Sequence, residues 1–358
     1  MNEVERAASL FNSLYQRADE YVSDYTAHVI FHCLERGGVR FHPEGVTILQ
    51  ILNRLGCVQQ MKPVVCWAIG YLLQQNMLLL SGDKLYRGPA AYQFREDHEL
   101  TGSVIVQPSL QLIQFAGRHW LDLVAGRIDP QWLAATIKQK RLWQAYYSNR
   151  HDLYAVYNQW AAEVFAERVD LEGTHLIEVG VGYGSASFAL LAECALRGVD
   201  ITGYTLEDND PILLEQTQKR LQNRFGAISF QSRLADLNQL HWVAPERFDH
   251  VFAVNGMVCT RDLTVTAQRL HSLVKPGGAV LLSQWVRPND CGKRHEEFIF
   301  SLLPGVRPFQ SETDLSVCFA FFTTEDWRSA FLNAGFRQVE VYVNPGEKSK
   351  AAIVKGLH

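Results

Sequence analysis

The stretch 174–184 reads Thr-His-Leu-Ile-Glu-Val-Gly-Val-Gly-Tyr-Gly and decides the fold of this chain. A short apolar strand runs into three glycines at alternate positions, Gly180, Gly182 and Gly184. Glycine lets the backbone turn tightly and approach a ligand closely, and the helix expected from Ser185 begins with free N–H groups. The junction therefore predicts the first strand–turn–helix unit of a sheet that binds a ligand at this turn.

Strands and helices alternate from this point onward. The sequence predicts strands at 174–180, 199–206, 227–233, 248–256 and 279–285, helices at 185–198, 211–226, 263–274 and 323–336, and a final pair of strands at 338–344 and 350–356. Such alternation is typical of an α/β fold, in which a mostly parallel sheet is covered by helices on both faces. Ligands bind these sheets outside the carboxyl ends of the strands.

The N-terminal part is predicted to be mainly helical. Three helical segments, 9–38, 46–56 and 64–76, precede a strand–turn–strand pattern at 77–87, which is the outline of a winged helix. The third segment is preceded by Lys62 and is otherwise apolar with Gln74 and Gln75 at its end, so it lacks the side chains that read bases and pair with phosphates. We therefore expect a lid, packing or dimerisation element rather than a DNA-binding one. Two further helical runs are predicted at 108–137 and 142–169.

The composition excludes several classes of protein. Of 358 residues, 47% are hydrophobic and 20% charged, which suffices for a core without disulfide bonds. The net charge of −4 disfavours nucleic acid and anionic membrane as partners. No apolar run reaches the roughly 18 residues of a membrane span, and the charged start lacks a signal-peptide core, so we expect a cytoplasmic protein. The seven scattered cysteines form no Cys-x-x-Cys pair, which predicts small buried side chains rather than a metal site.

The glycine loop also indicates the kind of ligand. Ser185 stands where a dinucleotide fingerprint would have its last glycine, and Glu178 lies two places before the first glycine. An acid there suits a cationic amino-acid ligand better than a pyrophosphate. The pattern is the one found in S-adenosylmethionine methyltransferases, although a glycine cluster alone also fits other nucleotide folds or a plain turn.

Polar residues follow the next three strands of the predicted sheet. Glu207 and Asp208 follow the second strand, where a carboxylate is suited to hold two ribose hydroxyls. Asp236 follows the third strand and is expected to accept from an adenine amino group, and Asn255 ends the fourth beside the methionine part. Singly, each acid is as well explained as a solvated loop residue or a helix cap. At successive strand ends they predict one cofactor crevice.

From about residue 20 to 340, the chain resembles the C-methyltransferase domain of polyketide synthases, freed from its megasynthase. The stretches that carry the resemblance are, in order, GYLLQQNMLLLSGDKLY, PSLQLIQFAGRHWLDLVAGRIDP, AYYSNRHDLYAVYNQW, LIEVGVGYG, YTLEDNDPILLEQ, VNGMVCTRDLTVTAQRLHSLVKPGG and FSLLPGVRPF. The resemblance implies a Rossmann-like methyltransferase sheet with an antiparallel final strand. It also implies a helical, winged-helix-like lid at 1–140, a linker at 141–173 and a cofactor-binding domain at 174–358. It places Tyr147 by the cofactor and favours Asp208 over Glu207 as the ribose ligand.

The chain departs from that family where the base should lie. In the family, a histidine after the fourth strand and a glutamate after the fifth form a dyad that deprotonates carbon, and the matching positions here are Val258 and Gln284. Valine does not titrate, and glutamine orients but accepts no proton at neutral pH. His151 and Tyr146 of the linker are the first candidates to replace the dyad, together with Gln284. His295, in the charged stretch Cys-Gly-Lys-Arg-His-Glu-Glu-Phe, is better explained by a solvated helix face.

These patterns favour an S-adenosylmethionine-dependent methyltransferase of polyketide or nonribosomal-peptide type metabolism, including antibiotic biosynthesis. Its partner is expected to be a small-molecule acceptor, either free or tethered to an acyl or peptidyl carrier protein, with no nucleic acid and no membrane; a homodimer is left open. The acceptor atom is also open among carbon, oxygen, nitrogen and sulfur. Two alternatives remain, a catalytically decayed scaffold and a winged-helix regulator that senses the cofactor.

Overall fold

The computed structural model describes residues 8–92, 94, 96–236, 247–257, 260, 262–287, 292–309, 314–345 and 350–358. Val258 and Cys259 therefore lie outside the described residues. Within these ranges no helix is both long enough and apolar enough to cross a membrane.

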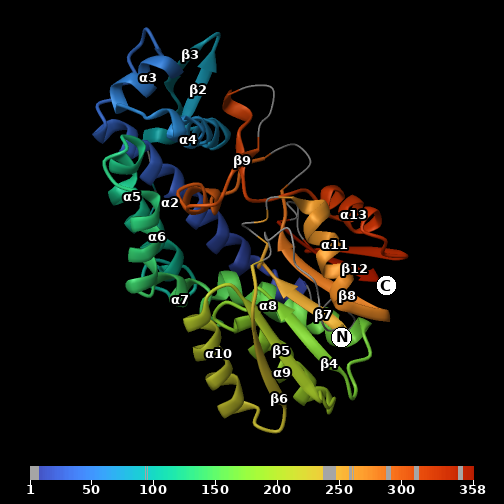
Figure 1. Ribbon diagram of the computed structural model, residues 1–358. Coiled ribbons are helices and arrows are strands. Elements are labelled where there is room, and N and C mark those ends of the chain that lie inside the picture. Colours follow the sequence, from blue (N-terminus) through green and yellow to red (C-terminus); the bar gives the residue numbers. More distant parts are fainter. Residues whose placement is uncertain are drawn as a thin grey trace.

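A seven-stranded sheet forms the C-terminal half (Figure 1). Its strands, in spatial order, are β11 (Gln338–Val343), β12 (Ala351–Leu357), β8 (Val274–Trp285), β7 (Phe248–Val254), β4 (His175–Val179), β5 (Gly203–Asp208) and β6 (Ser229–Leu234). β12 runs antiparallel to both of its neighbours, and the strands from β8 to β6 are parallel. The Rossmann-like sheet with an antiparallel final strand is thus confirmed.

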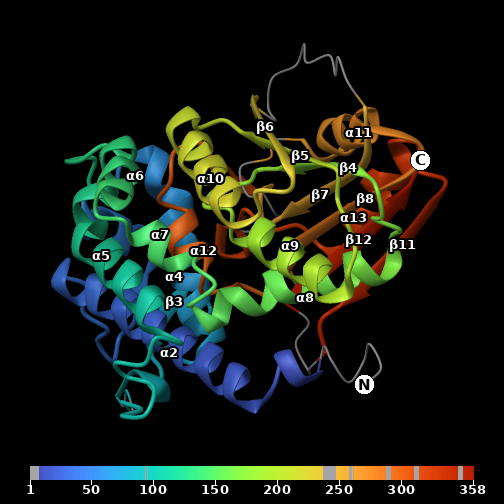
Figure 2. The same ribbon diagram turned by 90° about the horizontal axis from the view of Figure 1, so that it is seen from below.

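Helices cover both faces of this sheet (Figure 2). One face is covered by α8 (Asp152–Arg168), α9 (Ser185–Arg197) and α10 (Pro211–Arg224), and the other by α11 (Leu263–Leu273) and α13 (Thr324–Asn333). The central strands are buried on both sides, as Ile177 and Val251 illustrate with no exposed surface. This explains why the sequence shows continuous apolar runs rather than a strict alternation.

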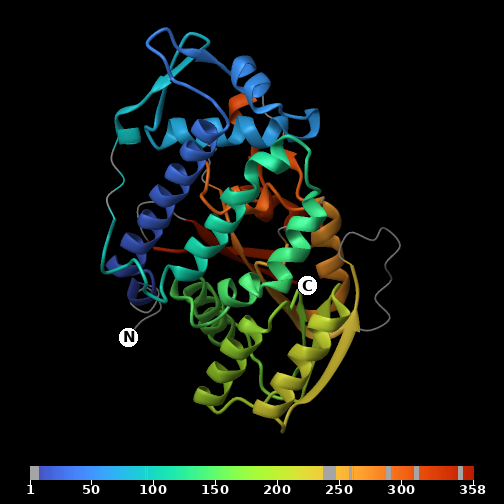
Figure 3. The same cartoon turned by 90° about the vertical axis from the view of Figure 1, so that its left-hand side faces the viewer.

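The N-terminal half is helical and contains a small three-stranded sheet. Its elements are α2 (Ser13–Arg36), β1 (Val46–Thr47), α3 (Ile48–Leu55), α4 (Lys62–Gln74), β2 (Leu78–Ser81), β3 (Lys84–Arg87), α5 (Gln107–Val124), α6 (Pro130–Gln139) and α7 (Leu142–Tyr146). The sheet order β1-β3-β2 gives the winged-helix outline that the sequence predicts. Figure 3 shows this part at one end of the molecule and the β4–β6 side of the main sheet at the other.

Local sequence explains where most of these helices begin and end. Asp129 caps α6 by accepting from the backbone N–H of Gln131, and Asp210 caps α10 in the same way. The predicted run 142–169 is broken between α7 and α8, where His151 is the N-cap residue. The division into a lid at 1–140, a linker at 141–173 and a catalytic domain at 174–358 stays a prediction.

A segment between β8 and α13 returns from the sheet to the N-terminal half. It contains α12 (Glu297–Phe300) and the short pair β9 (Pro308–Phe309) and β10 (Cys318–Phe319). The side-chain amide of Gln74 on α4 donates to the Lys293 carbonyl at 2.8 Å, and the Lys293 N–H donates back at 2.7 Å. The segment therefore joins the helical half to the sheet.

Candidate active site

A cavity of about 430 Å³ opens at the carboxyl ends of β4, β5 and β7, where the strand order reverses. It is lined by residues of α6, α7, α8 and α12, by the glycine loop and by the ends of β5 to β7. The predicted cofactor residues that line it are Tyr147, Glu178, Gly180, Gly182, Asp208, Asp236 and Asn255. Gly184 lies just behind, as the N-cap of α9.

The glycine loop has backbone angles and close contacts that residues with a Cβ do not tolerate. Gly180 and Gly184 have φ values of +73° and +74°. A Cβ on Gly180 would lie 2.9 Å from the Cα of Gly256, and one on Gly184 would lie 2.6 Å from the Cγ2 of Thr217. Both positions therefore require glycine for backbone angle and for space. The loop passes close to β7 and α10 and leaves a cradle open toward the cavity.

Glu178 is the acid at the base of this cradle. It is 1% exposed, and its Oε2 accepts hydrogen bonds from the Ser187 hydroxyl at 2.5 Å and the Tyr204 hydroxyl at 2.6 Å. Burial raises the pKa of Glu178 from 4.5 to about 7, and the two hydrogen bonds oppose this rise. Because both donors use one oxygen, the carboxylate can still accept a ligand cation at the cavity.

Asp208 connects the loop to the end of β5. Its Oδ2 accepts from the Gly182 N–H at 2.8 Å, and its Oδ1 accepts from the Asp210 N–H at 3.0 Å. Burial raises the pKa of Asp208, and these backbone hydrogen bonds oppose that shift. Glu207 next to it is 1% exposed and faces Arg233 and Arg269. Both residues line the cavity, and the choice of Asp208 over Glu207 as the ribose ligand stays a prediction.

Aromatic side chains also line the cavity. Trp143 stacks on Tyr147 and on Phe300, with ring centroids 5.2 and 5.8 Å apart. Tyr154 and Leu303 are also among the lining residues. Motif reasoning missed all of these except Tyr147, because aromatic residues in helical runs are usually core residues.

Lys138 is another cavity residue that the sequence did not single out. It lies on α6, lines the cavity and forms an ion pair with Asp210 at the start of α10. The pair bridges the helical half and the sheet at the cavity. No local pattern marks Lys138, because its partner is remote in the sequence.

The three catalytic candidates of the sequence lie away from this cavity. His151 is 1% exposed, with Nδ1 2.7 Å from the Tyr146 carbonyl and Nε2 3.0 Å from the Ser109 hydroxyl, and burial lowers the pKa of His151 to about 4. Tyr146 lines a separate, much smaller cavity together with His151. Gln284 is buried on β8, next to Trp285, and is not among the residues that line the larger cavity.

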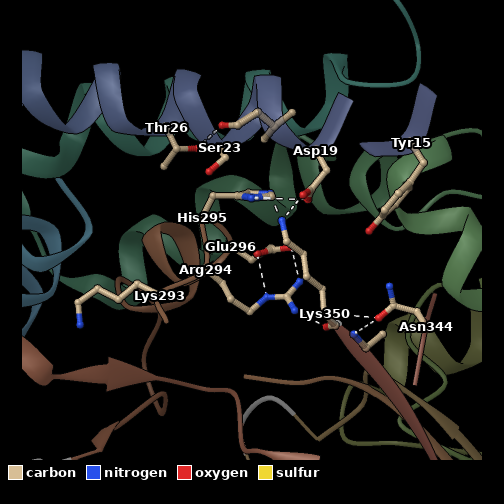
Figure 4. A network of polar contacts seen from close by, with 12 residues as sticks. Tyr15, Asp19, Ser23, Thr26, Lys293, Arg294, His295, Glu296, Asn344 and Lys350 are labelled. Atoms are coloured by element: carbon tan, nitrogen blue, oxygen red, sulfur yellow. Dashed lines mark hydrogen bonds and ion pairs between the residues drawn. The ribbon is translucent and has the colours of Figure 1, made fainter. Parts of the chain in front are cut away.

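The expectation of a solvated face around His295 is wrong. His295 and Glu296 are 6% exposed, and Glu296 accepts a pair of hydrogen bonds from the Arg294 guanidinium, one of them at 2.7 Å (Figure 4). Asp19 of α2 forms an ion pair with Lys350 and lies 3.9 Å from His295 Nδ1. Opposite charges from three remote segments neutralise one another, so this charged stretch is buried.

The fold and the cavity define a class. Residues 177–282 match the family model described as "Methyltransferase domain". With the strand order, the glycine cradle and the acids at the strand ends, this identifies the chain as an S-adenosylmethionine-dependent methyltransferase.

The curated proteins that the chain matches are polyketide synthases, and the solved structures that share its fold include carbon methyltransferases. The chain is 28% identical over 248 residues to the non-reducing polyketide synthase dpmpA of Macrophomina phaseolina, covering 65% of this chain and 11% of that protein. It spans about a tenth of the length of the curated relatives that it matches. The fold matches the CurJ carbon methyltransferase at a TM-score of 0.75 with 18% identity, covering 99% and 95% of the two chains. The citrinin polyketide synthase CMeT domain also matches at 0.75, with 17% identity and 99% and 94% coverage.

Proposed function

We propose that this chain methylates a small polyketide-type acceptor that brings its own nucleophile, such as an enolate, a phenolate or a thiolate. One observation carries the proposal: besides the acids assigned to the cofactor, the cavity is lined by the aromatic and apolar side chains of Trp143, Tyr147, Tyr154, Phe300 and Leu303. Among the described residues that line the cavity there is no histidine. The acids that line the cavity are assigned to the cofactor or pair with lysine or arginine side chains, so a carbon acid that must lose a proton in the site would lack a dedicated base.

The cavity fits the cofactor of this class. The glycine cradle leaves room for a closely approaching ligand, and Glu178 offers a carboxylate oxygen to an ammonium group. We assign Asp208 to the ribose hydroxyls, Asp236 to the adenine amino group and Asn255 to the methionine part, because each lines the same cavity. When bound, the cofactor supplies an electrophilic methyl group on a sulfonium.

The residues of the chain then act mainly by positioning. The stacked rings of Trp143, Tyr147 and Phe300 hold a flat acceptor and exclude water. Asn255 is held in the left-handed region, at φ 51°, and its Oδ1 accepts from the Trp285 N–H at 2.8 Å. Burial raises the pKa of Tyr154, so this hydroxyl stays protonated beside the cavity. Alignment of an existing nucleophile is the main source of acceleration in such a site.

The test compares acceptors that differ in acidity. The purified chain is incubated with S-adenosylmethionine and either a cyclic 1,3-dicarbonyl or phenol ionised at neutral pH, or a β-ketoacyl pantetheine thioester that is not. Mass spectrometry measures methylated product between pH 6 and 9. We expect rates to follow the ionisation of each acceptor. Efficient methylation of the un-ionised thioester, with a pH profile independent of the acceptor, would contradict the proposal.

The same assay separates the enzyme from a decayed scaffold. Calorimetry with S-adenosylhomocysteine is expected to show binding, whereas no binding at millimolar concentration would support the scaffold. Thioesters carried on an acyl carrier protein, compared with free pantetheine thioesters, determine whether the acceptor is tethered.

A further inference from the structure

Arg269 lies behind the cavity and contacts two of the segments that form it. It is on α11 and 5% exposed. Its Nη1 donates a hydrogen bond to the backbone carbonyl of Asp236, and its Nη2 lies 3.5 Å from Glu207 Oε1. One guanidinium therefore joins the end of β6 to the end of β5, the places assigned to adenine and ribose recognition.

Glu207 extends this connection to the glycine loop. Its backbone carbonyl accepts from the N–H groups of Gly180 at 2.8 Å and Val181 at 3.1 Å. Its carboxylate is also 3.2 Å from the Arg233 Nε. Because Asp208 is the next residue, a shift of Glu207 would move both the glycine loop and the Asp208 carboxylate.

The charges in this cluster favour a fixed geometry. Burial raises the pKa of Glu207, and the Arg269 and Arg233 guanidinium groups oppose that rise. A buried ion pair gains strength from its low-dielectric surroundings only when its geometry is well satisfied, and removing one partner leaves a charge without compensation. Arg269 donates to the Asp236 carbonyl and lies 3.5 Å from the Glu207 carboxylate, so it contacts both segments at once.

We propose that Arg269 is a positioning residue for base recognition. It fixes the backbone of Asp236 relative to Asp208, so that one ligand contacts Asp236 with its adenine and Asp208 with its ribose. The inference rests on the proposed cofactor assignment of Asp236 and Asp208. Arg269 is not among the residues that line the cavity, so its action is indirect. Without it, the Asp236 carboxylate loses its fixed position toward the base.

The experiment measures base discrimination by calorimetry. Binding of S-adenosylhomocysteine and of its hypoxanthine counterpart, S-inosylhomocysteine, is compared for the wild type, Arg269→Met, Arg269→Lys and Asp236→Ala. We expect Arg269→Met to weaken S-adenosylhomocysteine about tenfold or more, the usual effect of losing a hydrogen bond to a charged group. The affinity for S-inosylhomocysteine should fall less than the affinity for S-adenosylhomocysteine. The ratio of the two affinities should therefore move toward the ratio measured for Asp236→Ala. Arg269→Lys keeps one charged donor and should recover part of the ratio.

A matched control is Arg287→Met, at a second buried arginine. Arg287 pairs with Glu297 at 3.1 Å and donates to the carbonyls of Phe319 and Phe321, and none of these residues is among those that line the cavity. It should leave the affinity ratio unchanged. If Arg269→Met weakens both ligands equally while Asp236→Ala abolishes discrimination, Arg269 is merely structural and the inference is overturned. If Asp236→Ala itself leaves discrimination intact, the adenine assignment fails and the inference fails with it.

Discussion

Glutamine in place of Glu178 is expected to stabilise the free protein and to weaken cofactor binding. The buried carboxyl has its pKa raised from 4.5 to about 7, chiefly by burial. A difference of about 2.5 in pKa corresponds to about 3 kcal/mol, at about 1.4 kcal/mol for each pKa unit. Glutamine keeps an oxygen that accepts from Ser187 and Tyr204 but carries no charge.

The sign follows from proton linkage. The folded state holds the Glu178 proton more tightly than the unfolded state, so stability falls as pH rises from about 4.5 to about 7. Above about pH 7 the wild type bears the full destabilisation of an ionised, buried Glu178. There Glu178→Gln should raise the free energy of unfolding by up to about 3 kcal/mol. Below about pH 4.5 the two proteins should be equally stable.

Cofactor binding should show the opposite dependence. An ammonium ligand requires the ionised carboxylate, so the wild-type affinity for S-adenosylhomocysteine should rise between pH 6 and 8, with release of about half a proton near pH 7. Glu178→Gln should bind at least about tenfold more weakly and lose this pH dependence.

Two measurements check these expectations. Urea unfolding at pH 5 and pH 8 gives the stability, and calorimetry in buffers of different ionisation enthalpy gives affinity and proton release. Glu215→Gln is the control, because Glu215 is exposed on α10 and pairs with the equally exposed Lys219, so its effect should stay within about 0.5 kcal/mol. The reasoning is refuted if Glu178→Gln is no more stable than the wild type at pH 8, or if its affinity keeps the wild-type pH dependence.

Three further substitutions test other parts of the molecule. Asp208→Ala should abolish detectable S-adenosylhomocysteine binding in calorimetry while the circular dichroism spectrum is retained; unchanged binding would disprove the ribose assignment. Lys138→Met removes the ion pair with Asp210, and because Lys138 is half exposed, stability should change by less than about 1 kcal/mol. Its stopped-flow cofactor dissociation should nevertheless be faster, and an equal rate would show that the bridge does not retain the ligand. Asp19→Ala removes the ion-pair partner of Lys350 and should lower the free energy of unfolding in urea by about 3 kcal/mol. A loss below about 1 kcal/mol would show that this ion pair contributes little to stability.

Local patterns predicted most of the fold. Strand and helix positions from Thr174 onward follow from apolar runs, caps and glycines that act within a few residues. The predicted strand at 174–180 is β4, and the predicted helix at 185–198 is α9. Val179 ends β4 directly before the cradle. The cofactor crevice was predictable for the same reason, since parallel strands bring their carboxyl ends to one edge.

The catalytic candidates were harder to place, because their environment depends on remote segments. His151 lies in the linker that was expected to cover the cofactor. Both of its ring nitrogens instead form hydrogen bonds, one with the Ser109 hydroxyl of α5 and one with the Tyr146 carbonyl. The stretch around His295 has the composition of a solvated surface, and its burial depends on Asp19 and Lys350. Sequence spacing carries no information on such partners.

By itself, the sequence determined a methyltransferase sheet, a helical N-terminal part and the acids that face one crevice. Each of these follows from short-range periodicity and from the rule that parallel strands align their ends. Only the tertiary structure decided that Trp143 and Phe300 form one wall, that Lys138 meets Asp210, and that Arg269 stands behind Asp236. The physical reason is that these contacts join segments whose separation along the chain is unrelated to their distance in space.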